Sequence, residues 1–385
     1  MAIYYGDANG KAQEVIVVGK PGPQGPAGPQ GAPGPQGPAG QGVPTGGTVG
    51  QVLTKKTASD YDAEWETVPS KRTCRFVVGT STAGWTEADC DYLCDGTADD
   101  VEINAAIKAL YAKRMSGEVV ILSGIYKITK KIEMNVDNTT LRGNGLSTVL
   151  QRNFDAGDLW GSVIYSTAAD FVIRDLAIDG NRNAYSNRLN TGLIISSVDN
   201  KHSGLVKNVC AFNNQDTGIS VIGKNNIMLD SCVCHDNGAE GGDNYSGIYA
   251  FNCEYISITS CVCYNNFYAG IQVSGGTEIK SVIGNNTCYN NDVGIVLADD
   301  GAGSVTGNIT LNNNIGIYLL VCKNNEISGN VCFRGTGLPS DYSSSQHTIK
   351  ADGGSKNNLT IGNNIIGKNY VDSGINNTWA NNKYQ

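Results

Sequence analysis

The chain between Gly192 and Gly335 repeats one short phrase, Gly-Ile-x-aliphatic. Its copies are Gly218-Ile-Ser-Val, Gly247-Ile-Tyr-Ala, Gly270-Ile-Gln-Val, Gly294-Ile-Val-Leu and Gly316-Ile-Tyr-Leu, with Gly192-Leu-Ile-Ile as a looser version. Successive copies are 22 to 29 residues apart. A near-constant period in this range indicates stacked repeats, in which each unit buries its apolar face against its neighbours.

A second pattern runs between these copies, with apolar and polar residues alternating over two short stretches before a terminal Asn. Residues 171–181, 227–237, 256–266 and 359–369 fit this frame. Alternation with period two indicates strands, and the runs are too short for helices. About three short strands per repeat, joined by tight corners, predict an all-β fold, a parallel β-helix. Its equivalent positions should stack about 4.8 Å apart.

Alignment of the repeats predicts columns of equivalent residues. The eighth position should hold Ile178, Cys210, Cys234, Cys263, Cys288, Thr310, Cys332 and Ile366. The sixth should hold Leu176, Asn208, Cys232, Cys261, Asn286, Asn308, Asn330 and Asn364, and the eleventh Asn181, Asn213, Asn237, Asn266, Asn291, Asn313, Gly335 and Asn369. Stacked Asn side chains at corners bond their neighbours and tolerate left-handed backbone. Inward Cys acts as a small hydrophobe, so most of the 12 cysteines should lie in the core as reduced thiols.

Composition fits a solenoid and argues against two kinds of partner. Only 17% of the 385 residues are charged, 49 are glycine, and the formal net charge is −8. A negative chain without clustered Lys and Arg is not expected to bind nucleic acid. No apolar run reaches the length of a membrane span, so we expect no membrane insertion. The start of the chain lacks the features of a secretory signal, which favours assembly in a reducing cytoplasm.

The first 42 residues predict two different elements. Residues 1–18 are expected to form a β-hairpin around the Asn9-Gly10 turn, which pairs with other copies or with a host particle; a disordered tip is the alternative. In residues 19–42, Gly falls at every third position up to Gly40. Only Gly fits the axis of a collagen triple helix, so this stalk predicts a parallel homotrimer rather than a solitary polyproline linker.

Residues 43–70 predict a small β linker that also supports trimerisation. Its apolar anchors should be Leu53, Tyr61 and Trp65, on either side of a polar break. This segment resembles a linker module that recurs in bacteriophage fibre proteins, often beside collagen-like triplets.

Residues 71–118 predict a lead-in segment with a capping helix, followed by the β-helix over residues 119–385. Asp99 and Glu102 are spaced like a capping box. One apolar helix face should then cover the open end of the solenoid. This face consists of Ile103, Ala106, Ile107, Leu110 and Tyr111. Cys90 and Cys94 lack a second pair of ligands, so we predict no metal site, and no cofactor.

The segments 94–107, 117–126 and 140–145 resemble the N-terminal cap and first coils of the pectate-lyase-like right-handed β-helix family, as found in phage tailspikes and fibres. The resemblance covers about residues 86 to 370. It implies a right-handed solenoid and a virion protein assembled in the host bacterial cytoplasm, attached to the tail or head through its N-terminus. Chemistry is not implied, because this family includes lyases, hydrolases and members that only bind.

The catalytic candidates are carboxylates near two enlarged corners. Two carboxyls about 5 to 10 Å apart can act as acid with nucleophile or base. Asp179 and Asp236 should stand two strand spacings apart, about 10 Å, on the outside of the solenoid. Glu240 and Asp243 lie in the glycine-rich corner that follows. The alternative is that 178–181 is a corner formed for turn reasons alone.

The carbohydrate-binding candidates surround these carboxylates. They are Arg182, Arg188, His235, Tyr245, Tyr264 and Tyr289. An outward aromatic ladder suits sugar rings, and it suits a subunit interface equally well. The other candidate interface is the column Ile194, Ser220, Tyr249, Gln272, Val296 and Tyr318.

Three functions therefore stay open on the sequence. The first is a host-recognising spike that binds surface glycan. The second is the same spike acting as a polysaccharide depolymerase, either a glycoside hydrolase or a lyase. The third is a purely structural fibre that decorates a virion head or a bacterial or spore surface.

Overall fold

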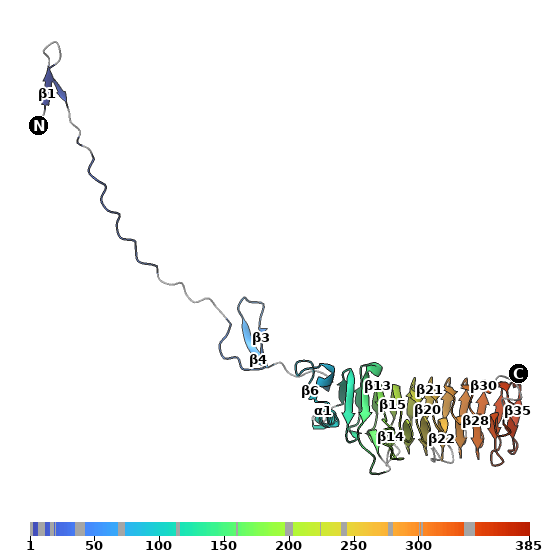
Figure 1. The fold of residues 1–385 in the computed structure, drawn as a ribbon. Coiled ribbons are helices and arrows are strands. Elements are labelled where there is room, and N and C mark those ends of the chain that lie inside the picture. Colours follow the sequence, from blue (N-terminus) through green and yellow to red (C-terminus); the bar gives the residue numbers. More distant parts are fainter. Residues whose placement is uncertain are drawn as a thin grey trace. The chain divides into compact units, whose positions relative to one another are not determined.

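The structure is a computed structural model that describes residues 3–6, 12–15, 19, 21–34, 43–67, 74–112, 116–158, 161–196, 203–223, 225–239, 245–275, 280–299, 301, 303–334 and 343–385. The chain forms two compact units, Met1–Lys71 and Arg72–Gln385. Figure 1 shows the second unit as a stack of short strands running along one axis.

The first unit contains two small hairpins. β1 (Ile3–Gly6) pairs antiparallel with β2 (Ala12–Val15), as expected for the N-terminal hairpin. Residues 21–34 are exposed and have no regular secondary structure within one chain. β3 (Gln51–Lys55) pairs with β4 (Ala63–Thr67), and Leu53 lies opposite Trp65. The Trp65 ring packs over Gly47, where a Cβ would lie 2.6 Å from it, so only glycine fits.

The second unit contains two long sheets. The 22-stranded sheet holds β5 (Cys74–Thr80), β6 (Tyr92–Cys94), β7 (Gly117–Ile121), β8 (Gly124–Ile128), β10 (Thr139–Arg142), β11 (Thr148–Arg152), β13 (Phe171–Asp179), β15 (Gly204–Phe212), β17 (Ile227–Asp230), β18 (Val233–His235), β20 (Ser257–Thr259), β21 (Val262–Tyr264), β23 (Val282–Gly284), β24 (Thr287–Tyr289), β26 (Ser304–Thr306), β27 (Ile309–Leu311), β29 (Glu326–Ser328), β30 (Val331–Arg334), β32 (Leu359–Ile361), β33 (Asn364–Gly367), β35 (Thr378–Ala380) and β36 (Lys383–Tyr384). The ten-stranded sheet holds β9 (Ile132–Met134), β12 (Ser162–Ser166), β14 (Thr191–Ser196), β16 (Ile219–Ile222), β19 (Ile248–Phe251), β22 (Ala269–Ser274), β25 (Val293–Ala298), β28 (Ile315–Leu320), β31 (His347–Ala351) and β34 (Val371–Asp372). Within the described residues, the helical elements are α1 (Asp100–Ala112) and the short 3-10 turns η1 (Ser81–Ala83) and η2 (Gly145–Ser147).

Each full coil contributes one strand to each of three rows. The first row includes β17, β20 and β23, the second row includes β18, β21 and β24, and the third row is the ten-stranded sheet. Neighbouring coils pair in parallel throughout the solenoid, for example β21 with β24 and β22 with β25. The predicted fold class, an all-β right-handed parallel β-helix, is confirmed.

The two repeated phrases of the sequence depend on each other. The Ile of each Gly-Ile phrase, such as Ile219 and Ile248, points into the core and is fully buried. Except at Gly316, which lies against Thr310 and Thr348, the preceding Gly lies against an Asn side chain of the corner. A Cβ on Gly218 would lie 2.9 Å from Nδ2 of Asn237 and 2.7 Å from the Gly247 carbonyl oxygen. Glycine is therefore required wherever this corner Asn is present.

Three ladders of Asn side chains connect the coils. The first runs Asn214, Asn237, Asn266, Asn291 and Asn313, the second Asn286, Asn308, Asn330, Asn363 and Asn382, and the third Asn325, Asn358 and Asn377. Within each ladder the side-chain NH2 group donates to the amide oxygen of the next coil, and most also donate to a backbone carbonyl, so these buried donors are satisfied. Asn214 Oδ1, at the start of the first ladder, accepts no hydrogen bond from the described residues.

All three predicted columns are shifted by one residue in the coil of residues 204–214, and the sixth and eighth positions are also shifted in the coil of residues 359–367. Ala211, not Cys210, pairs with Ile178 and Cys234, and Ile365, not Ile366, pairs with Cys332. The ladders correspondingly use Asn214 and Asn363 in place of Asn213 and Asn364. Asn208 and Asn213 instead take the left-handed corner positions, with φ of 52° and 54°. Cys210 consequently faces outward, although it is buried.

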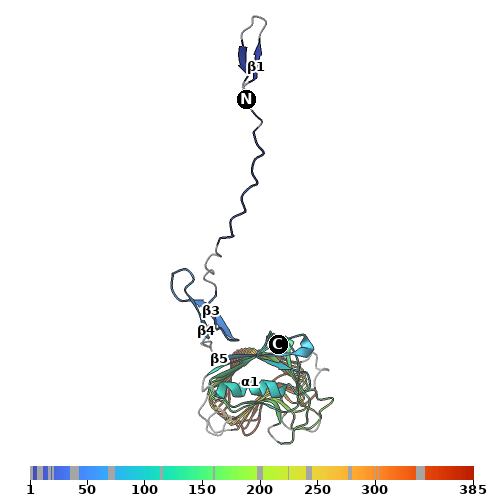
Figure 2. The same ribbon diagram turned by 90° about the vertical axis from the view of Figure 1, so that its left-hand side faces the viewer.

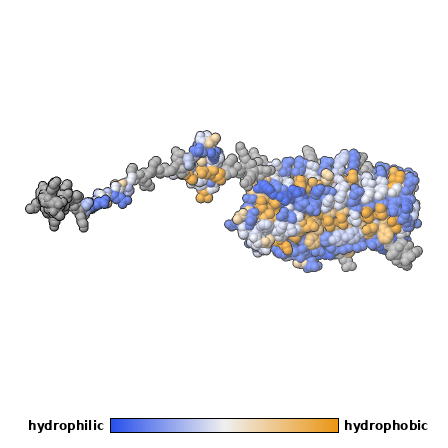
Figure 3. Space-filling view, turned by 90° about the horizontal axis from the view of Figure 1, so that it is seen from above, coloured by the Kyte–Doolittle hydropathy of each residue, from blue (hydrophilic) through white to orange (hydrophobic). Residues whose placement is uncertain are grey.

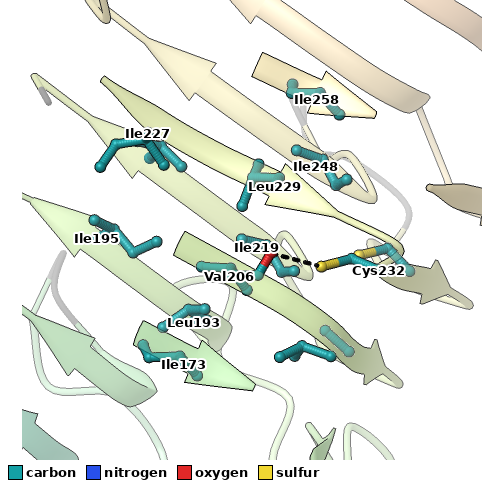
Figure 4. Close-up of a cluster of buried hydrophobic side chains, with 14 of the residues drawn as sticks. Ile173, Leu193, Ile195, Val206, Ile219, Ile227, Leu229, Cys232, Ile248 and Ile258 are labelled. Atoms are coloured by element: carbon teal, nitrogen blue, oxygen red, sulfur yellow. Dashed lines mark hydrogen bonds between the residues drawn. The ribbon is translucent and has the colours of Figure 1, made fainter. Parts of the chain in front are cut away.

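The core is continuous from the cap to the last coil. Figure 4 shows part of it, where inward Ile, Leu, Val and Cys side chains of successive coils interdigitate and the Cys232 thiol donates to the Val206 carbonyl oxygen at 3.7 Å. All 12 cysteines are free thiols, and all except Cys90 are buried. At the last coil the core meets the half-buried Tyr370 and Trp379, whose rings stack 3.9 Å apart.

The predicted capping helix is confirmed as α1, which lies across the end of the solenoid in Figure 2. Its buried side chains are Ile103, Ala106, Ile107 and Leu110; the side chain of Tyr111 lies outside the described residues. The predicted capping box is wrong, because the Asp99 carboxylate accepts from the backbone N–H groups of Gly96 and Lys127. Among the described residues, no helix has the length and apolarity of a membrane span.

Candidate functional site

The outward residues of the second row form one column that changes character along the solenoid. At its start, Lys127 donates to Gln151, and Gln151 Nε2 donates to Asp179 Oδ2 at 2.8 Å. The other oxygen of Asp179 accepts from the backbone N–H of Asn181 at 2.9 Å. Asp179 is therefore already engaged on both carboxylate oxygens.

The column continues as a ladder of stacked rings: Phe212, His235, Tyr264 and Tyr289. Their centroids are 4.7 to 5.2 Å apart and neighbouring planes differ by at most 5°. The predicted alignment of His235, Tyr264 and Tyr289 is confirmed, and Phe212 is a ring that the sequence alignment missed. Leu311 and Phe333 continue the column. Between neighbours the ring faces cover each other, so mainly ring edges point outward.

Asp236 lies at the corner that follows His235. Its Oδ2 contacts His235 Nδ1 at 2.7 Å, while His235 Nε2 lies 3.7 Å from the Cys210 thiol. One strand separates Asp179 from His235, so the predicted spacing of about 10 Å to Asp236 agrees with the register. Asp236 has φ of 54°, as the corner residue Asn265 has in the next coil. The turn conformation alone therefore explains why an Asp stands at this corner, and a catalytic role is not needed to explain it.

Corners from three coils form a hydrogen-bonded ridge along the edge between the second and third rows. Tyr185 donates to Asn153, and the Asn187 backbone donates to Asp155. Further along, Arg182 Nη1 donates to the Gly238 carbonyl oxygen at 2.7 Å. We call residues 153–158, 181–190 and 236–239 the corner ridge.

The remaining predicted site residues fall around this ridge. Arg188 is exposed on it, and Tyr245 is half-buried beside Gly238. Glu240 and Asp243 lie outside the described residues. The pairing of an arginine from one enlarged corner with the backbone of the other shows that the two corners meet, as the sequence predicts.

A buried arginine supports the ridge from below. Arg152 donates to the carbonyl oxygens of Gly161 and Thr191 and to Asn190 Oδ1, and its guanidinium lies over the Phe154 ring at 4.5 Å. Burial lowers its pKa to about 10. The cation remains charged at neutral pH and fixes the loop through backbone carbonyls, which is a structural role.

The structure adds a cleft that the sequence did not indicate. It has a volume of about 500 Å³ and lies between α1, the turn before β9 and the first loop of the ridge. Its lining holds three lysines, Lys108, Lys130 and Lys131, and three carboxylates, Asp100, Glu133 and Asp158, and Phe154 and Val101 contribute apolar surface. This size is in the range of small-ligand pockets. Three segments distant in sequence form it, so no local motif could have revealed it.

One group in the described part of the chain has the composition of a metal site, Cys94, Asp99 and Glu102. The Asp99 carboxylate is already bonded to two backbone N–H groups. Burial raises the pKa of the Cys94 thiol and disfavours the thiolate that a metal would need. We assign these residues to the cap.

The third row does not offer the second interface considered from the sequence. Ile194, Ser220, Gln272 and Val296 point outward, yet each is buried within the chain itself. Val296 belongs to a small apolar cluster with Ala269, Val293 and Ala298, against which Tyr318 packs. That column is therefore largely covered in the single chain.

These features define a right-handed β-helix that carries the corner ridge along one edge. Residues 242–385 match the family described as right handed beta helix region. A comparison with curated proteins gives no match.

Solved structures share the fold at low sequence identity. The A-module of mannuronan C-5 epimerase AlgE4 from Azotobacter vinelandii has a TM-score of 0.57 and 17% identity, covering 80% of this chain and 97% of that one. The Dettilon tailspike protein has a TM-score of 0.52 and 16% identity, covering 75% and 66%. The pre-mature gene product 12 of bacteriophage phi29 has a TM-score of 0.59 and 16% identity, covering 75% and 44%. At these identities the likeness concerns the fold alone.

Proposed function

We propose that this protein is a bacteriophage fibre or tailspike protein that binds carbohydrate on the host surface and so mediates adsorption. The corner ridge with its adjoining cleft carries the proposal, because it gathers polar loops, cations and an aromatic ring on one edge of a rigid scaffold. The triplet stalk and the fold shared with phage tailspikes support the assignment to a virion. Residues 1–18 would attach it to the particle.

The ligand should be an acidic or hydroxyl-rich glycan. Lys108 and Lys130 are exposed at the cleft and would pair with carboxylates of a capsular polysaccharide, while Phe154 would pack against a sugar ring. Arg188 extends the cationic surface along the ridge. Arg182 is tied to Gly238 and would shape the ridge rather than move to the ligand.

A glycan array and whole host cells, probed with the intact protein, test this proposal. The double variant Lys108→Ala/Lys130→Ala should lose about tenfold or more in affinity, and Lys356→Ala, an exposed lysine on a distant coil, should bind like the parent. Equal binding by all three proteins would place the glycan elsewhere. Absence of binding to both cells and array would favour a purely structural fibre.

Polysaccharide cleavage is the second candidate, favoured by the His235–Asp236 contact and by a carbohydrate-modifying enzyme among proteins of this fold. Both nitrogens of His235 are engaged and both oxygens of Asp179 are bonded, so the site would have to rearrange to act. Release of reducing ends or unsaturated sugars from host capsule would establish cleavage. A clear halo on host lawns would give the same answer.

A further inference from the structure

Two outward columns of the second row are mainly apolar over the same six coils. One consists of Cys210, Val233, Val262, Thr287, Ile309 and Val331, and the other of Phe212, His235, Tyr264, Tyr289, Leu311 and Phe333. We call these residues the apolar strip. On the face seen in Figure 3, hydrophobic residues form a band along the solenoid between hydrophilic margins.

The first row of the same sheet provides an internal comparison. In the same six coils, one of its outward columns reads Lys207, Asp230, Thr259, Gly284, Thr306 and Ser328, and the other reads Leu205, Met228, Ser257, Val282, Ser304 and Glu326. Outward positions that face water are normally polar, and nine of these twelve residues are polar or glycine. The apolar strip breaks that rule in every coil, so its composition points to a partner.

Ring stacking argues against a sugar platform on the strip. Sugar binding on an aromatic surface uses ring faces, and the faces of His235 and Tyr264 are covered by the rings above and below them. The ring edges that remain exposed lie beside Val262 and Ile309. A mainly apolar surface of this kind, with tyrosine hydroxyls on it, suits packing against another protein surface.

The strip is smaller than the surface that a stable protein interface usually buries. Five strand spacings give a length of about 24 Å, and two columns with their side chains give on the order of 300 Å². Exposed apolar patches of this size mark interaction sites, yet a stable interface usually buries about 800 Å² per partner. A tether between the partners would make up for the small area, since linked partners meet at an effective concentration of about millimolar.

We propose that the apolar strips of three copies of this chain pack together around a three-fold axis. This inference rests on the proposed fibre function and on the parallel homotrimer that the sequence predicts, in which the Gly triplets from Gly19 to Gly40 would bring three chains together. In a parallel trimer with the strips on the axis, each strip residue meets its own copies at the same height. The corner ridge then lies to one side of the contact.

Thiol cross-linking of the full-length protein tests this arrangement. Ile309→Cys places a thiol on the strip, where Ile309 is 40% exposed, and Thr306→Cys places one in the polar first row of the same coil. A short bis-maleimide should link Ile309→Cys chains into covalent dimers and leave Thr306→Cys chains at the parent level. Cys90, the one native thiol that is not buried, sets that background.

Sedimentation equilibrium of the same samples separates the possible failures. A trimer in which Thr306→Cys cross-links and Ile309→Cys does not would overturn the strip as the interface and leave the fibre intact. A trimer in which neither variant cross-links would also overturn it. A monomeric parent would overturn the trimer and the strip together. A trimer with selective linkage through position 309 is the expected result.

Discussion

Replacing Asn291 by Asp tests whether the Asn ladder holds the coils together. Nδ2 of Asn291 donates to the carbonyl oxygen of Cys263 and to Oδ1 of Asn313, both at 3.1 Å. Its Oδ1 accepts two N–H groups of Asn266 at 3.0 Å. Aspartate has the same shape, so the change leaves no cavity and keeps the accepting side. It replaces one donor group by a second acceptor.

These contacts set the stability that Asn291→Asp is expected to lose. The Cys263 carbonyl loses its side-chain donor, and Asn313 Oδ1 keeps only the backbone N–H of residue 291. A buried polar group left without its partner costs about 1–3 kcal/mol, so two weakened acceptors predict a loss of about 3 kcal/mol. Burial should raise the pKa of the new carboxyl above its unfolded value of about 3.9. The loss should therefore be smallest at low pH, where the acid is protonated, and grow as pH rises.

Hydrogen exchange is the suitable assay, because stacked repeats open regionally and do not unfold in one step. A loss of about 3 kcal/mol predicts roughly a hundredfold faster exchange in peptides spanning β21 to β27 at neutral pH. Asn290→Asp is the matched control, since Asn290 is an exposed corner residue with φ of 55°, and Asp236 has the same conformation two coils earlier. Equal exchange in the two variants would refute the ladder argument.

Three further outcomes are expected. Asp236→Asn should keep the parent's thermal stability and glycan binding, because Asn265 already takes the equivalent corner conformation. If the protein cleaves polysaccharide, the same variant should have no cleavage activity. Unchanged cleavage would show that Asp236 is not a catalytic residue. Gly31→Ala should lower the melting temperature of the stalk, measured by circular dichroism, because only Gly fits the triple-helix axis. The control variant Gln30→Ala should change this temperature far less. Equal melting temperatures of the two variants would count against a triple helix. Alkylation of the native protein followed by mass spectrometry should modify Cys90 alone of the 12 thiols. Because burial raises the Cys90 pKa, the rate of this alkylation should rise with pH only above the range of a free thiol. Rapid labelling at neutral pH, or a disulfide between Cys234 and Cys263, would contradict this.

The repeats themselves made the fold predictable. Gly-Ile phrases at a near-constant spacing, with period-two runs between them, leave few alternatives to stacked coils, and α1 follows from its apolar face. The alignment failed by one residue in two coils, and each of these coils contains an adjacent Asn pair, Asn213-Asn214 or Asn363-Asn364. Pattern alone cannot decide which Asn takes the corner and which points inward. Backbone conformation decides it, because Asn213 has positive φ and Asn214 bonds into the ladder.

The outward surface depended far more on tertiary structure. The sequence placed His235, Tyr264 and Tyr289 in one outward column, but only the structure shows that their faces stack and that the outward column next to them is mainly aliphatic. The cleft joins Lys108 on α1 to Lys130 and Phe154 from later loops. Local periodicity fixes which side of a strand faces the core, because that depends on neighbours along the chain. Which outward residues meet depends on how separate coils and the cap pack, and that is decided only when the chain folds.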